Sequence, residues 1–314
     1  MATSQGTLAE GMAGQLRPEP GRLSRSWKWT KWFFRTKPLG AVSMVISLFM
    51  VVVALGAFIG ILVPQDPIKV NGADRLLGFF SESTRIEGQF YIFGTDELGR
   101  DMFSRIVKGA QISVFFALGA CLISVTIGGM VGLASAYFGG KFDMFVQRVI
   151  DAIQTIPFLV LAIAIVSILG PGLWQGFWTV ALVGIPRPAR VIRGSVLSAK
   201  ENVWAEAARS IGASNRRVMY RHILPNVAAP MIVLATYVIA VAVLIEASLS
   251  FLGIGAQPPT PSWGAMLTGT GRLYFETHPR LALLPGIAIS VLVFGTNMFG
   301  DALRDVLDPK LRNR

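Results

Sequence analysis

The 314-residue sequence is 53% hydrophobic and only 15% charged, and its mean hydropathy is +0.56. A soluble domain of average composition has about 25% charged residues, so this composition indicates a membrane protein. The net charge of +11 would suit a nucleic-acid-binding protein. The basic residues are spread between apolar segments instead of forming one patch, so we expect no nucleic-acid partner.

The chain begins with a segment that we interpret as a cytoplasmic tail and interfacial anchor, residues 1–38. Residues 1–26 are rich in Gly, Pro, Ser and Arg without apolar periodicity, which is typical of a flexible tail. Residues 27–35 mix aromatic with basic side chains, a composition that anchors a chain at the membrane surface. The apolar run that follows is too long for the core of a cleavable signal peptide.

Five apolar runs are long enough to cross a bilayer as α-helices, because about 20 helical residues span a hydrocarbon core of about 30 Å. They are residues 39–63, 112–138, 149–169, 227–252 and 281–299. A sixth run, 173–185, reaches only about 20 Å, so it is either re-entrant or completed by its flanks. We expect Pro186 and Pro188 to bend its end.

Charge asymmetry decides between five and six spans. With six, the segments on one side are 1–38, 139–148, 187–225 and 301–314, and they carry 21 of the 29 Lys and Arg. The positive-inside rule then places both termini and the loop 187–225 in the cytoplasm. The sequence therefore predicts an all-α membrane protein with six transmembrane helices, an extracytoplasmic loop 64–111, a core 112–300 and a cytoplasmic tail 301–314.

The loop 64–111 has nearly balanced charge, which argues against an anion-binding surface. Gly94 and Gly99 permit tight turns near the ionisable residues Asp96, Arg100 and Asp101. On physical grounds alone we expect a helix cap at Asp101 and ordinary surface ion pairs.

Two carboxylates fall within apolar runs. Asp151 lies three residues after Arg148, so we expect a pair at the end of a helix. Glu246 lies well inside its run and should face the bundle interior or the pathway, with pairing to hydroxyls such as Ser248 an equal alternative.

Metal and disulfide chemistry are not expected. Cys121 is the one cysteine, and two histidines are too few for a metal cluster, so we expect no metal, cofactor or catalytic residue. Gly128 and Gly132 form a small-residue pair suited to close helix packing.

The polar loop between the apolar runs 173–185 and 227–252 has the features of a short lever. Residues 202–211 are rich in helix formers, Gly212 supplies a stop, and a second helical stretch, 215–223, leads to Pro225. Val203, Ala207 and Ile211 share one helix face, while Glu206 and Arg209 project elsewhere. This face could dock into a groove on another protein or lie on the membrane surface, and the pattern alone does not separate the two.

Four motifs resemble those of one transporter family. They are Glu206-Ala207-Ala208-Arg209 with Gly212 and Ile223-Leu224-Pro225, residues 93–105, residues 246–264, and residues 300–310. In this order and spacing they are similar to the permease subunits of the dipeptide, oligopeptide and nickel ABC importers, of the type with a Gly-Arg-Asp segment. The resemblance covers about residues 39–310.

This resemblance implies a type I ABC importer permease fold with a cytoplasmic coupling helix at Glu206, Ala207, Ala208, Arg209 and Gly212. It further implies a bacterial plasma-membrane location and, as partners, a second permease, two ATP-binding subunits and an extracytoplasmic substrate-binding protein. The expected role is ATP-driven uptake of peptides, nickel or related solutes. The chain contains no phosphate-binding loop of its own, so ATP hydrolysis is expected elsewhere. The alternative is an ion-coupled secondary transporter or channel, which would need more intramembrane ionisable residues.

Overall fold

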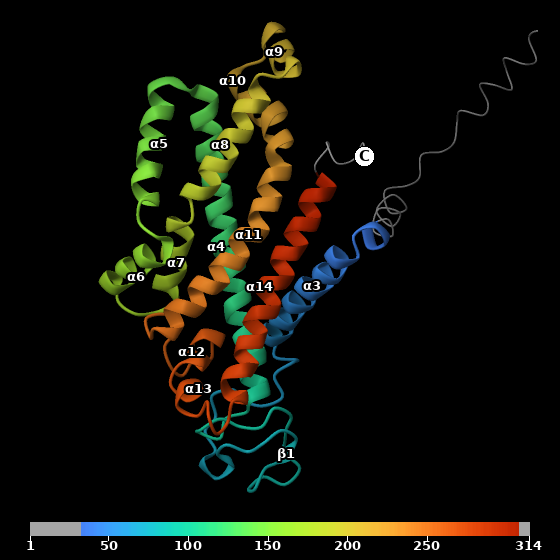
Figure 1. The fold of residues 1–314 in the computed structure, drawn as a ribbon, viewed down its shortest axis with the longest axis vertical. Helices are drawn as coiled ribbons and strands as arrows, with labels where there is room; N and C mark the ends of the chain where they lie inside the picture. Colours follow the sequence, from blue (N-terminus) through green and yellow to red (C-terminus); the bar gives the residue numbers. More distant parts are fainter. Residues whose placement is uncertain (1–32, 308–314) are drawn as a thin grey trace, which may run out of the picture.

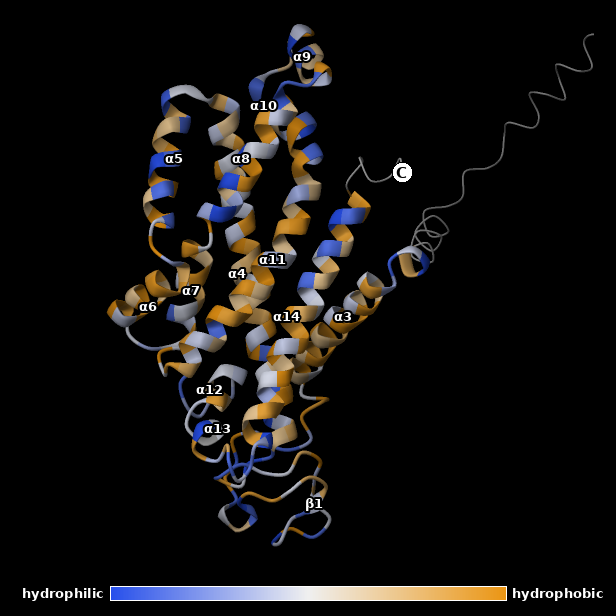
Figure 2. Cartoon of the chain, viewed as in Figure 1, coloured by the Kyte–Doolittle hydropathy of each residue, from blue (hydrophilic) through white to orange (hydrophobic). Residues whose placement is uncertain are grey.

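The computed structural model describes residues 33–307, which fold mainly as α-helices (Figure 1). Four helical runs are long and apolar enough to cross a membrane: α3 (Pro38–Ile59), α4 (Met102–Phe138), Asn215–Phe251 and α14 (Arg280–Leu307). Figure 2 shows α3 largely in the orange of apolar residues. The protein is therefore a multi-pass helical membrane protein. The predicted tail 1–26, most of the anchor 27–35 and residues 308–314 lie outside the described part of the chain.

The third predicted span, 149–169, is not one straight helix. It is divided between α5 (Gly140–Gln154) and α6 (Phe158–Leu169), whose axes differ by 84°. Pro157 stands at the break, where it lacks a backbone N–H and disfavours helical dihedral angles at Ile156. If this bent pair is one span, the described residues contain five spans by length and composition.

The short predicted span 173–185 forms α7 (Leu173–Val183), which is too short to cross a membrane alone. It is followed by α8 (Pro186–Lys200), and the two intervening residues, Gly184 and Ile185, also have helical dihedral angles. Helical dihedral angles therefore continue from α7 into α8. Residues 187–200, predicted as the start of a loop, are helical instead.

Helix α8 packs closely against α4 because two glycines leave room for its backbone. A Cβ atom on Gly132 would lie 2.2 Å from the carbonyl oxygen of Ala189, and one on Gly128 would lie 2.6 Å from that of Ile185. Leu133 of α4 and Ile192 and Val196 of α8 are fully buried in the resulting contact. The small-residue pair thus serves packing within this chain.

The run Asn215–Phe251 joins α10 (Asn215–Arg217), a π-helical turn (Val218–Ile223) and α11 (Leu224–Phe251). The second helical stretch predicted at 215–223 is therefore the beginning of a membrane-crossing helix. Helix α4 starts at Met102 and not at residue 112, because Asp101 caps its N-terminus. A core of small and β-branched side chains, including Ala117, Ala181 and Val243, fills the space between α4, α7 and α11.

The two ends of the bundle differ in structure (Figure 1). At one end, called here the hairpin end, lie the short strands β1 (Ser81–Glu82) and β2 (Phe90–Tyr91), which pair antiparallel. The short helices α12 (Trp263–Leu267) and α13 (Thr270–Leu273) lie toward this end. At the opposite end, called here the α9 end, lies α9 (Val203–Ser210).

Candidate functional site

Helix α9 projects from the bundle (Figure 1), and a turn at Gly212 follows it. Gly212 has a φ of +81°, the left-handed conformation that glycine adopts most easily. The Gly212 N–H donates to the Arg209 carbonyl at 2.9 Å, and the Ala213 N–H donates to the Ala208 carbonyl at 3.1 Å. These two bonds form a Schellman motif, which fixes the direction of the chain after the helix.

The apolar face of α9 is open to its surroundings. Val203 is 81% exposed and Ile211 is 85% exposed, and Ala207, Glu206 and Arg209 are exposed as well. An isoleucine that is this exposed leaves most of its apolar area available to a partner. The face predicted from the helical spacing is thus present and unoccupied by other described parts of this chain.

The opposite face of α9 is attached to the bundle. Ala205 and Ala208 are buried, and Ala208 belongs to a cluster with Val218 and Ile223 of the π-helical turn. The guanidinium of Arg209 also lies 5.7 Å from the centre of the Tyr137 ring on α4. Next to α9, Lys200 Nζ of α8 donates to the Ala136 carbonyl of α4 at 2.9 Å, and the Tyr137 hydroxyl donates to Asn215 Oδ1 at 2.8 Å. Helix α9 is therefore packed against α8 and the π-helical turn that precedes α11.

Glu246 is buried in the bundle, with 1% of its surface exposed. Its two carboxylate oxygens accept hydrogen bonds of 2.9 Å from the hydroxyls of Ser113 on α4 and Ser250 on α11. Ser248, the partner suggested by sequence proximity, donates instead to the Leu244 carbonyl. The carboxyl group therefore joins α4 to the end of α11, and Ser113 could not be identified from local spacing.

The segment that contains Gly94 and Asp101 is a buried polar network and not a set of surface pairs. Asp96 is 2% exposed and accepts hydrogen bonds from the Leu98 and Arg100 N–H groups, both at 2.9 Å, and from Arg100 Nε at 2.6 Å. Arg105 Nε adds a contact of 3.4 Å. Asp101 caps α4, with its side chain accepting from Ser104 N at 2.9 Å. The cap was predicted correctly, while the burial of the ion pairs was not.

Two glycines allow this network to close. Gly94 and Gly99 have φ values of +71° and +73°. A Cβ on Gly99 would lie 1.7 Å from the Asn71 carbonyl oxygen, and one on Gly94 would lie 2.1 Å from that of Leu77. Both positions therefore require glycine for space as well as for conformation.

Asp74 organises the rest of the hairpin end, although no sequence signal singled it out. It is fully buried and accepts hydrogen bonds from Asn71, Ser83, Thr84 and Tyr91. Burial alone would raise the pKa of Asp74, but the hydrogen bonds from Ser83, Thr84 and Tyr91 outweigh it and hold the pKa at about 2. Burial, followed by the contact with Asp74, raises the pKa of Tyr91. These donors are scattered between residues 71 and 91, so only the fold brings them together.

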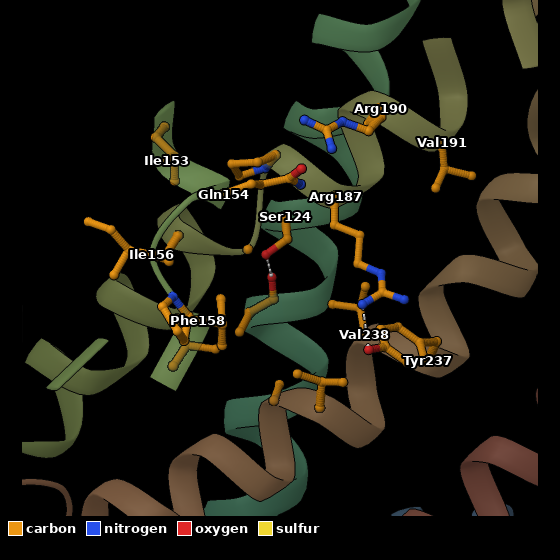
Figure 3. Close-up of a pocket in the computed structure, with 18 residues that line it drawn as sticks. Ser124, Ile153, Gln154, Ile156, Phe158, Arg187, Arg190, Val191, Tyr237 and Val238 are labelled. Carbon is orange, nitrogen blue, oxygen red and sulfur yellow. Dashed lines mark hydrogen bonds between the residues drawn. The ribbon is translucent and has the colours of Figure 1, made fainter. Parts of the chain in front are cut away.

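A cavity of about 520 Å³ lies where α5 and α6 bend away from α8 and the middle of α11 (Figure 3). Asp151 lies at the end of α5 and pairs with Arg190 of α8, not with Arg148 as its spacing suggested. Arg187 Nη1 donates to the Tyr237 hydroxyl at 2.6 Å, and its guanidinium lies 4.0 Å from the centre of the Tyr237 ring. Arg187 was predicted to lie in a cytoplasmic loop, and its partner is fifty positions away, so the pair could not be predicted.

Within residues 33–307, no group of three His, Cys, Asp or Glu side chains is placed to hold a metal ion. Cys121 is buried, and its thiol donates to the Ala235 carbonyl at 3.3 Å.

Residues 124–313 match the protein family described as binding-protein-dependent transport system inner membrane component. Three curated relatives are similar over much of their lengths. A dipeptide transport system permease protein DppC of Alkalihalophilus pseudofirmus is 40% identical over 88% of this chain and 87% of its own. A glutathione transport system permease protein GsiD of Escherichia coli is 37% identical over 94% of both chains. A putative peptide transport system permease protein of Brucella suis is 44% identical over 72% of this chain and 75% of its own.

Among solved structures, the fold is similar to a chain of the MetNI methionine ABC transporter in an inward-facing conformation. The TM-score is 0.54 with 18% sequence identity, over 66% of this chain and 98% of that chain. A second crystal form of the same transporter gives a TM-score of 0.51. At this identity the likeness concerns the fold alone.

Proposed function

Because the chain belongs to the family of binding-protein-dependent transport system inner membrane components, we propose that it is a permease subunit for ATP-driven solute uptake. Peptides, in particular dipeptides, are the substrate class that we propose, since relatives named for dipeptide, peptide and glutathione transport match most of the chain. The chain would form the pathway together with a second, different permease. Two ATP-binding subunits and an extracytoplasmic substrate-binding protein complete the proposed complex.

The orientation proposed for this subunit has both termini and the α9 end in the cytoplasm. The basic residues support it: even without Arg187 and Arg190, which line a cavity of the bundle, the segments 1–38, 139–148, 187–225 and 301–314 carry 19 of the 29 Lys and Arg. In Figure 1 the beginning of α3 and the end of α14 lie toward the α9 end, which supports this orientation. Six spans result if α5 with α6, and α7 with α8, each cross once. The segment 64–111 would then meet the binding protein.

The proposed mechanism rests on one observation: α9 exposes one face to a possible partner while its other face is packed against the bundle. We assign ATPase coupling to Glu206, Ala207, Ala208, Arg209 and Gly212 of this helix and its turn. Closure of the ATP-binding subunits would move α9, and the buried junction at Ala208 would carry that movement into α8 and α11. The pathway would alternate between its two openings in response.

The experiment that tests this function is uptake of radiolabelled alanyl-alanine by the complete complex in proteoliposomes, with the binding protein outside. We expect uptake that requires ATP on the side of the ATP-binding subunits and continues when the proton gradient is collapsed. Uptake that persists without ATP and follows an imposed proton gradient would instead support an ion-coupled secondary transporter.

A further inference from the structure

The cavity between the α5–α6 bend and α11 has two dissimilar walls. In Figure 3, Ile153, Ile156 and Phe158 lie on one side, and Arg187 extends toward Tyr237 on the other. The volume of about 520 Å³ lies within the range of about 300–1,000 Å³ that is common for small-molecule sites. The arrangement offers an apolar surface that faces one fixed cationic group.

Arg187 brings a positive charge that this part of the chain does not neutralise. The second guanidinium of the cavity, Arg190, is paired with Asp151. Arg187 forms no ion pair among residues 33–307, and its hydrogen-bond partner Tyr237 is a neutral phenol. The cavity therefore carries a net positive charge at this guanidinium.

The residues next to this charge pack in the apolar part of the bundle. Pro188, the next residue, packs against Gly128 of α4, which lies within the uncharged stretch 112–138. Tyr237 lies near the middle of the run Asn215–Phe251. Arg187 itself is exposed in this chain, so its guanidinium is accessible from the cavity. A cation among apolar spans is normally retained for a functional reason and with a defined counter-charge.

The geometry leaves the guanidinium able to bind a further group. The stacking on the Tyr237 ring and the bond to its hydroxyl fix the orientation of Arg187 while using one of its five N–H donors. The remaining donors can grip a planar carboxylate with two parallel hydrogen bonds. A peptide, whose C-terminus is a carboxylate, has the complementary chemistry, and the apolar wall can receive its side chains.

We propose that Arg187, held by Tyr237, is a binding subsite for the carboxylate of the transported solute inside this cavity. This inference rests on the proposed function, which supplies the solute. It adds the chemical class that the pathway recognises: a small molecule with a free carboxylate next to an apolar portion.

The test uses the complete complex in proteoliposomes with a cysteine as a chemically adjustable charge. Arg187→Cys is made in a Cys121→Ala background, and Cys121→Ala alone is the control. Maximal uptake is measured for alanyl-alanine and for its C-terminal amide, each at concentrations that saturate the binding protein. The thiol is then modified with a methanethiosulfonate that adds an ethylammonium group or with the uncharged methyl reagent.

We expect Arg187→Cys to lower the maximal uptake of alanyl-alanine about tenfold, the effect of losing one charge-assisted contact. The ratio of free to amidated dipeptide uptake should fall to about one, rise again with ethylammonium and stay unchanged with the methyl reagent. An unchanged ratio in Arg187→Cys, or equal recovery with both reagents, overturns the inference. A wild-type complex that carries neither dipeptide refutes the proposed function instead.

Two further experiments separate the proposed subsite from a failure of the subunit to assemble and from binding of a lipid phosphate. Tyr237→Phe keeps the ring and the packing but removes the hydroxyl, so the ratio should fall here too even if Arg187→Cys does not assemble, and an unchanged ratio contradicts the inference. In vesicles made without anionic lipids the charge dependence should persist. If it disappears there, the bound anion is a lipid phosphate and the inference is wrong.

Discussion

Ile211 offers the sharpest test of the α9 surface. It is 85% exposed, so replacing it with alanine removes almost nothing from the packing of the subunit itself. If the side chain is buried in a groove of an ATP-binding subunit, Ile211→Ala removes three carbon groups worth about 0.8 kcal/mol each, or about 2 kcal/mol in total. That loss corresponds to about thirtyfold weaker binding.

The assay is titration of the detergent-solubilised permease pair with purified ATP-binding subunits, measured as a dissociation constant. Ile168→Ala is a matched control, because Ile168 on α6 is also 85% exposed but belongs to a different surface. We expect Ile211→Ala to weaken binding about thirtyfold and Ile168→Ala to change it less than twofold. Equal dissociation constants for Ile211→Ala and the wild type would refute docking through this face.

Four other changes have defined expectations. Glu206→Lys or Gly212→Pro should abolish uptake while the subunit remains in the membrane, because proline cannot adopt the φ of +81° or donate the N–H of Gly212; normal uptake by both would contradict the coupling role. Gly99→Ala should lower the melting temperature more than Gly88→Ala does. Gly88 has a similar φ of +77° but open space around its Cβ, so equal shifts would rule out the clash of residue 99 with Asn71. Glu246→Leu should leave the complex assembled but reduce uptake, and unchanged uptake would exclude a role for the buried carboxyl group in transport. Because the folded-state pKa of Asp74 is depressed to about 2, its contribution to stability is complete above about pH 4 and is lost as pH falls toward 2; Asp74→Asn should remove this part of the acid sensitivity in a thermal-shift series, and an identical pH profile would oppose the assignment.

The elements that could be predicted from sequence are those that depend on local patterns. Long apolar runs locate α3, α4, α11 and α14, and the helix formers before Gly212 locate α9 and its Schellman turn. The bend between α5 and α6 was missed because average hydropathy does not register the lost N–H of Pro157, although the proline itself was a visible signal.

The interactions that could not be predicted join residues far apart in the chain. The Ser113 hydroxyl on α4 donates to Glu246 on α11, and Arg187 on α8 donates to Tyr237 on α11. Asp74 gathers donors from a loop with little regular structure, so no period in the sequence marks it. Tertiary packing, not local propensity, creates each of these sites.

In the proposed orientation, α9 faces the compartment of the ATP-binding subunits, and the hairpin end faces the opposite side of the membrane. Both Ser210, at the end of α9, and Glu87, between the two strands, are exposed, so each can be replaced with cysteine in the Cys121→Ala background. A membrane-impermeant maleimide should label Ser210→Cys only in inside-out vesicles and Glu87→Cys only in intact cells. Labelling of Ser210→Cys in intact cells would contradict the account.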